Sequence, residues 1–113
     1  MSVGMVLKIV AALGTAATGL LALVKPSAAY SFTGLKAEGV RGLSEMRAIF
    51  GGLFIALGVM PLFLGATAYQ MLGIAYLAIA VARAFSIVFD KSYARSNTIS
   101  LVIEIVFGVI LIV

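Results

Sequence analysis

Residues 3–24 read VGMVLKIVAALGTAATGLLALV and carry one charged side chain, Lys8. As an α-helix, this run would reach about 33 Å at ~1.5 Å per residue, which is enough to cross the ~30 Å hydrocarbon core of a bilayer. Ser27-Ala28-Ala29 resembles a signal-peptide cleavage site, but the apolar run is longer than a typical signal-peptide core. The stretch therefore predicts a membrane-spanning helix.

The same pattern continues through the rest of the chain. Hydrophobic residues make up 64% of the 113 residues and charged residues 11%, with a mean hydropathy of +1.25. A soluble domain carries roughly 25% charged residues. We therefore expect an all-α fold, a four-helix transmembrane bundle forming a single domain over 1–113. Its expected helices are 3–24, 45–65, 66–89 and 98–113, with polar loops at 25–44 and 90–97.

Turn residues and loop charges predict how these helices are arranged. The short turn at Gly65 predicts that the second and third helices form an antiparallel hairpin. Both polar loops are basic, whereas the turn at Gly65 carries no charge. By the positive-inside rule, the basic loops should be cytoplasmic and both termini should lie on the outer side. The same rule explains the net charge of +4 without a nucleic-acid partner.

The residue inventory narrows the chemistry. The chain has no Cys and no His, which excludes disulfides, thiol chemistry and imidazole ligation of zinc or haem. Nucleophilic catalysis needs an activating base within hydrogen-bonding reach of the nucleophile, and Lys8 lies at the wrong depth to activate Ser100. We therefore expect a non-enzymatic protein with no catalytic residue, no metal and no cofactor.

Beyond Glu45 at the first position of the second span, four charged residues fall within the predicted spans: Lys8, Arg47, Arg83 and Glu104. An unpaired charge near the bilayer centre costs about 2.5–3.5 kcal/mol on insertion scales, so such residues need partners or water. Arg83 and Glu104 lie ~9 Å and ~10 Å from the ends of helices joined by a short loop. Their equal depth predicts a buried ion pair. Lys8 has no acid at its level, so it should either snorkel outward or approach the Val113 carboxylate.

Small and polar residues accompany these charges at helical spacing, which is typical of inward faces. Arg47 either snorkels to the membrane surface or turns inward toward Glu104. If Arg47 and Arg83 both pair with Glu104, one positive charge is left, which an anionic lipid could balance. Alternatively, the charges only lock the helices together. The predicted polar cluster and candidate ligand site comprises Arg47, Gly51, Tyr76, Arg83, Ser100 and Glu104.

The string Glu45-Met46-Arg47-Ala48-Ile49-Phe50-Gly51-Gly52, followed by Arg83 and Glu104, resembles a family of small bacterial four-helix membrane proteins catalogued as a domain of unknown function. The resemblance covers nearly the whole chain, and E-x-R-x-x-x-G-G is its most specific part. It implies a four-helix bundle in the bacterial inner (plasma) membrane with these charges inside, and it implies no reaction. A looser likeness to DoxX-type proteins adds nothing on function.

Two functions are compatible with the sequence. The first is an accessory or scaffolding subunit, in a homo-oligomer or larger membrane complex, or a module that binds lipid or a small amphiphile. The second is a small proton-coupled transporter or channel that uses Glu104. The chain is similar in architecture to the small multidrug resistance family. It departs from that family because its membrane glutamate lies in the fourth helix and it has no tryptophan.

Overall fold

The computed structural model describes residues 2–113, apart from the side chain of Phe32. Over that range the chain is helical, without strands, and four helices are long and apolar enough to cross a membrane. The predicted all-α fold with four potential spans is confirmed. The elements are α1 (Val3–Val24), η1 (Pro26–Ala29), α2 (Tyr30–Thr33), α3 (Gly39–Glu45), η2 (Met46–Leu53), α4 (Phe54–Val59), α5 (Pro61–Leu64), α6 (Ala66–Phe89) and α7 (Arg95–Ile112).

The second span is a composite helix over Gly39–Leu64, made of α3, η2, α4 and α5. It begins at Gly39 rather than at residue 45, so part of the expected loop is helical. Its η2 segment is a π-helix, a rare form that is often found at functional positions. Pro61 begins α5 at the far end, where its missing N–H costs little because it opens a new helical turn.

The composite helix packs against α1 through close approaches at glycines. A Cβ added to Gly19 would lie 2.7 Å from the main-chain nitrogen of Ile55, and one added to Gly58 would lie 2.8 Å from the Cβ of Ala16. Real side chains do not fit at such distances, so only glycine allows the backbones to come this close. Helix α1 and the composite helix therefore form one tightly packed hairpin, called here the first hairpin.

Helices α6 and α7 form the second hairpin in the same way. A Cβ on Gly73 would lie 2.9 Å from the carbonyl oxygen of Gly108, and one on Gly108 would lie 2.6 Å from the Cγ of Leu77. Leu72 and Leu111 are almost completely buried beside these glycines. The connection between the two helices is the short loop after Phe89, where Lys91 adopts a positive φ of 56°.

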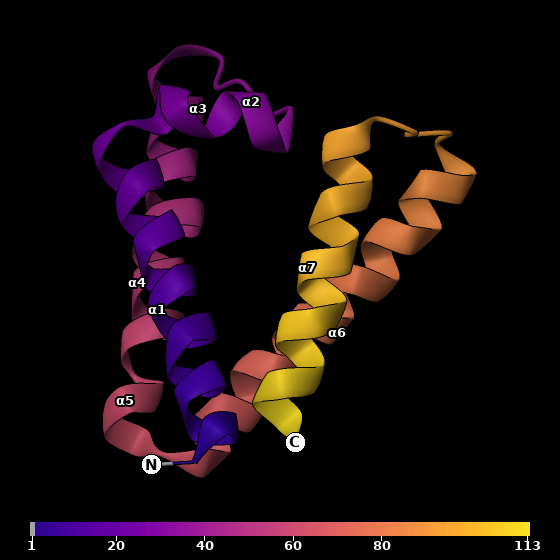
Figure 1. Cartoon of the computed structure of the whole chain (residues 1–113). Coiled ribbons are helices and arrows are strands. Elements are labelled where there is room, and N and C mark those ends of the chain that lie inside the picture. The colour runs from indigo at the N-terminus through magenta and orange to yellow at the C-terminus, as the bar shows by residue number, and fades with distance from the viewer. Residues whose placement is uncertain (1) are drawn as a thin grey trace.

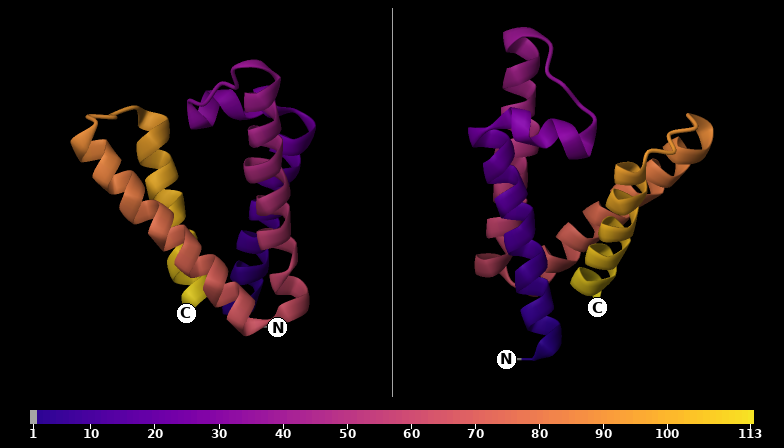
Figure 2. Two further views of the ribbon diagram at one scale, coloured as in Figure 1. Left: turned by 180° about the vertical axis from the view of Figure 1, so that it is seen from behind. Right: turned by 45° about the horizontal axis from the view of Figure 1, so that its top comes forward.

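The two hairpins meet at the end of the molecule that carries both termini and diverge toward the basic loops (Figure 1). The other views show the same opening (Figure 2). The hairpin expected between the second and third spans is wrong: α6 leaves the turn at Gly65, with φ 84°, and contacts the composite helix through α5. Close contacts at glycines determine which helices pack together. Gly58 in the second span packs against α1, and Gly73 in the third span packs against α7, so the second and third spans do not pack against each other beyond α5.

A small core joins the hairpins where they meet, built from Ala11, Ala12, Tyr69, Leu72 and Leu111. At the open end, η1 and α2 turn across the top of the first hairpin, and α2 contacts α7 (Figure 1). Large apolar side chains cover the outer surfaces, such as Val81, Phe85 and Val88 on α6. This distribution is typical of a protein surrounded by lipid rather than by water.

Candidate functional site

Arg83 on α6 and Glu104 on α7 form a two-pronged ion pair within the second hairpin. Arg83 Nε donates to Glu104 Oε1 at 2.8 Å, and Arg83 Nη2 donates to Glu104 Oε2 at 2.7 Å. Such bidentate pairs are among the strongest hydrogen-bonded contacts in proteins. The ion pair expected from the equal depth of these residues is present in the structure.

Asn97 is the third member of this cluster. Its Oδ1 accepts from Arg83 Nη1 at 2.7 Å, while its Nδ2 donates to the hydroxyl and carbonyl oxygens of Ser92 at 3.0 and 3.2 Å. Asn97 thereby links Arg83 to the loop between α6 and α7. An asparagine at the start of an apolar run is typical of a helix cap, whereas here α7 begins at Arg95 and Asn97 lies inside it.

The cluster is neutral and its polar atoms are occupied. Glu104 has 8% of its surface exposed, and the Arg83 side chain has 31% exposed. Among the described residues, every buried side-chain nitrogen or oxygen has a hydrogen-bond partner. Both carboxylate oxygens of Glu104 accept hydrogen bonds from one guanidinium, so the pair joins α6 to α7 at two points. The geometry therefore favours a role in fixing α6 against α7.

A second polar contact joins the two hairpins. Tyr76 on α6 and Thr15 on α1 share a short hydrogen bond between their hydroxyls. Thr15 has a single hydroxyl proton, which it donates to the carbonyl oxygen of Ala11 at 2.8 Å. Tyr76 must therefore be the donor in the inter-hairpin bond. The ring of Tyr76 also packs edge-on against Phe107, with centroids 5.6 Å apart.

Of the remaining members of the predicted cluster, two lie in the first hairpin and one lies on α7 beside Glu104. Arg47 is exposed on η2 and donates to the carbonyl oxygen of Leu23 at the end of α1, and Gly51 packs against Leu23 in the same hairpin. Ser100 is half-buried one helical turn from Glu104. The structure thus brings Arg83 and Glu104 together, places Tyr76 on the same helix as Arg83, and assigns Arg47 and Gly51 to the first hairpin.

Lys8 lines a hollow of about 400 Å³ between α1 and α7, near the end where the hairpins meet. Val113 lines the same hollow, as do Ser2 and Met5. Within residues 2–113, no ion pair shorter than 4.0 Å joins Lys8 to Val113. Of the arrangements predicted for Lys8, the direct ion pair with the Val113 carboxylate is not formed, and snorkelling to the outer surface stays a prediction.

Comparison with known proteins gives a family for this chain. Residues 5–113 match the family described as Domain of unknown function (DUF4345). The chain belongs to this family. Residues 45–52, Arg83 and Glu104 predicted a family catalogued as a domain of unknown function, and the DUF4345 match is to such a family. Searches among curated proteins and among solved structures gave no match.

Proposed function

We propose that this DUF4345 chain is a non-enzymatic membrane module that binds a lipid or similar amphiphile between its two hairpins. The observation that carries the proposal is the shape of the molecule. Each hairpin is closed by glycine contacts, yet the hairpins diverge from each other toward the basic loops (Figure 1). Within a bilayer, apolar side chains on diverging helices that do not pack against each other would contact acyl chains, because the hydrocarbon region holds no water to cover them.

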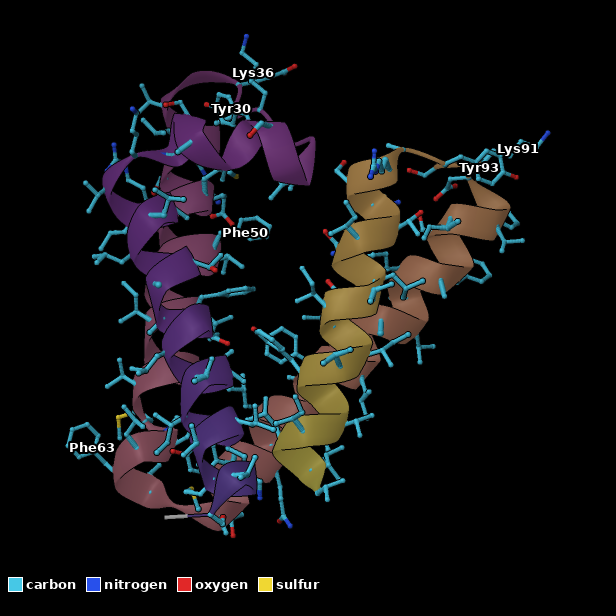
Figure 3. All side chains as sticks on the ribbon, in the orientation of Figure 1. Tyr30, Lys36, Phe50, Phe63, Lys91 and Tyr93 are labelled. Carbon is cyan, nitrogen blue, oxygen red and sulfur yellow. The ribbon has the colours of Figure 1, made fainter. Side chains whose placement is uncertain are left out.

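The residues on either side of this space support an amphiphilic occupant. Phe50 on η2 points from the first hairpin toward α7 (Figure 3). Tyr76 and Phe107 close the narrow end, where Tyr76 bonds Thr15. An apolar tail between aromatic walls with a head near the basic loops would match this arrangement. Binding sites for small molecules commonly combine apolar walls with a few polar groups.

The proton-coupled transporter is less well supported. That function requires Glu104 to exchange protons, and Arg83 occupies both of its oxygens. An accessory role within a larger membrane complex is compatible with the lipid-binding proposal, because the outer faces of α6 and α7 are apolar. We also propose that the protein lies in the inner membrane of a bacterium, with its basic loops in the cytoplasm.

The absence of tryptophan from the sequence allows a direct test. Phe50→Trp places a single tryptophan on the side of the first hairpin that faces α7, and the matched variant Phe85→Trp places one on the outer face, where Phe85 is 65% exposed. Purified protein in detergent is titrated with brominated phospholipid, which quenches tryptophan on contact. Quenching should saturate at stoichiometric lipid for Phe50→Trp and rise in proportion to bulk lipid for Phe85→Trp. Two proportional curves would contradict the proposal.

A further inference from the structure

A hollow of about 420 Å³ opens at the end of the first hairpin that carries the basic loop. It lies between the segment before α3 and the start of the second span. Met46, Ile49 and Phe50 supply its apolar wall, and Lys36, Glu38 and Glu45 supply its polar rim. Its volume is within the range of sites that hold small ligands, about 300–1,000 Å³.

The rim carries both signs of charge, and Arg41, which does not line the hollow, neutralises one of its two carboxylates. Arg41 forms an ion pair with Glu45, so these two side chains and the pair Lys36 and Glu38 sum to zero formal charge. Lys36 and Glu38 are exposed and form no ion pair with any described residue. A purely anionic head would meet Lys36 and also two carboxylates. A head that carries one positive and one negative group would satisfy both signs.

The apolar wall of the hollow extends toward the second hairpin at Phe50. Phe50 lines the hollow, and its side chain points toward α7, while Lys36 extends outward at the loop end (Figure 3). Met46 is buried beneath them. A tail attached to a head in the hollow would therefore run along Phe50 on the side of the first hairpin that faces α7.

We infer that this hollow holds the head of a zwitterionic phospholipid bearing a primary ammonium group, of the phosphoethanolamine class. Lys36 binds the phosphate, and the ammonium donates to Glu38 and to the free oxygen of Glu45. The inference rests on the proposed lipid-binding function and names its substrate class. A quaternary ammonium head has the same charges but no N–H donor, so it cannot form these charge-assisted hydrogen bonds.

Native mass spectrometry of the full chain, with three phospholipids of identical acyl chains, tests this assignment. The probes carry phosphoethanolamine, phosphocholine and phosphoglycerol heads. The wild-type protein should retain the phosphoethanolamine lipid about tenfold better than the phosphocholine lipid, the factor that ~1.4 kcal/mol gives at 25 °C. Equal retention of these two lipids, or preference for the anionic phosphoglycerol lipid, would overturn the inference.

Three variants separate the roles of the rim residues. Glu38→Gln should abolish most of the preference for the phosphoethanolamine lipid over the phosphocholine lipid. Lys36→Gln should lower the retention of both lipids by the same factor. Lys91→Gln removes an exposed lysine from the other basic loop and serves as the matched control, with wild-type retention expected. A Lys91→Gln effect as large as that of Lys36→Gln would show general surface attraction and overturn the inference.

The two proposals fail in different ways. Saturable quenching of Phe50→Trp without any discrimination among heads would leave lipid binding in place and overturn the assignment of the hollow. Loss of saturable quenching together with loss of lipid retention would overturn both. A second protein chain seated on the hollow would appear as a dimer that excludes lipid in the same spectra, which also overturns the inference.

Discussion

At the scale of single residues, Arg83 is the side chain whose presence in an apolar helix most needs explanation. All three of its nitrogen groups donate to Glu104 or Asn97, so its charge and its hydrogen-bonding groups are matched inside the second hairpin. A buried pair of this kind does not by itself stabilise a fold relative to apolar residues, but removing one partner leaves an uncompensated charge. The ion pair therefore holds α6 and α7 together.

For this ion pair, removing one partner should destabilise the protein more than removing both. Glu104→Gln should lower the free energy of unfolding by about 3–5 kcal/mol, because Arg83 would be left without its counter-charge. The double variant Glu104→Gln with Arg83→Leu should recover part of this loss. Glu45→Gln, which breaks an exposed ion pair with Arg41, is the control and should cost at most about 1 kcal/mol. Unfolding in mixed detergent, followed by circular dichroism, measures the free energy of unfolding of all three variants. Equal losses for Glu104→Gln and Glu45→Gln would show that the ion pair does not hold α6 and α7 together.

The Tyr76 hydroxyl provides a second prediction at this scale. Tyr76→Phe removes the donor to Thr15 but leaves the bond from Thr15 to Ala11 intact, so no buried proton loses its acceptor. The expected cost is about 1 kcal/mol, the net value of a typical hydrogen bond. Tyr93→Phe, on an exposed ring, should be neutral. The same unfolding assay distinguishes them, and a neutral Tyr76→Phe would show that this contact does not hold the hairpins together.

The sequence predicted part of this site. Equal distance from the ends of adjacent helices was sufficient to pair Arg83 with Glu104. Asn97 was missed because an amide at the start of an apolar run equally suits a helix cap. The position of Arg47 stayed undecided, since depth alone does not tell which helix a side chain faces. In the structure it bonds the Leu23 carbonyl oxygen in the other hairpin.

At the scale of elements, hydropathy and turn residues predicted the four spans, and the bounds of 3–24 and 66–89 coincide with α1 and α6. The pairing of the spans was not predictable in the same way. A short turn brings two helix ends together but does not fix the angle at which the helices leave it. Close glycine contacts then decide the partners, and they are Gly58 with α1 and Gly73 with α7.

These glycines predict a sharp contrast within one helix. Gly58→Ala would place a Cβ against the backbone of Ala12 and Ala16, so α1 and α4 must separate, at a cost of about 1–3 kcal/mol. Gly52→Ala is the matched control, because Gly52 is exposed and the nearest atom to its added Cβ is 4.0 Å away. Unfolding midpoints of the two variants in one detergent compare them directly. An equal effect at both positions would contradict the packing of the first hairpin.

At the scale of the whole molecule, both basic loops lie at the open end and both termini at the joined end (Figure 1). The positive-inside rule then predicts that the open end faces the cytoplasm. Because the chain has no cysteine, single thiols report orientation cleanly. In intact cells, a membrane-impermeant thiol reagent should label Thr67→Cys and leave Lys91→Cys unlabelled until the cells are opened. The reverse pattern would place the basic loops outside.

If this protein binds lipid as proposed, the two hairpins stay apart in a membrane because lipid lies between them. Spin labels at Lys25→Cys and Lys91→Cys report the separation across the opening, and labels at Lys25→Cys and Ala48→Cys report the packed distance within the first hairpin. Pulsed electron-spin distance measurements in lipid nanodiscs compare the two pairs. The distance across the opening should exceed the packed distance by more than one helix diameter, about 10 Å. Equal distances in the two pairs would show a closed bundle with no room for lipid and would contradict the account.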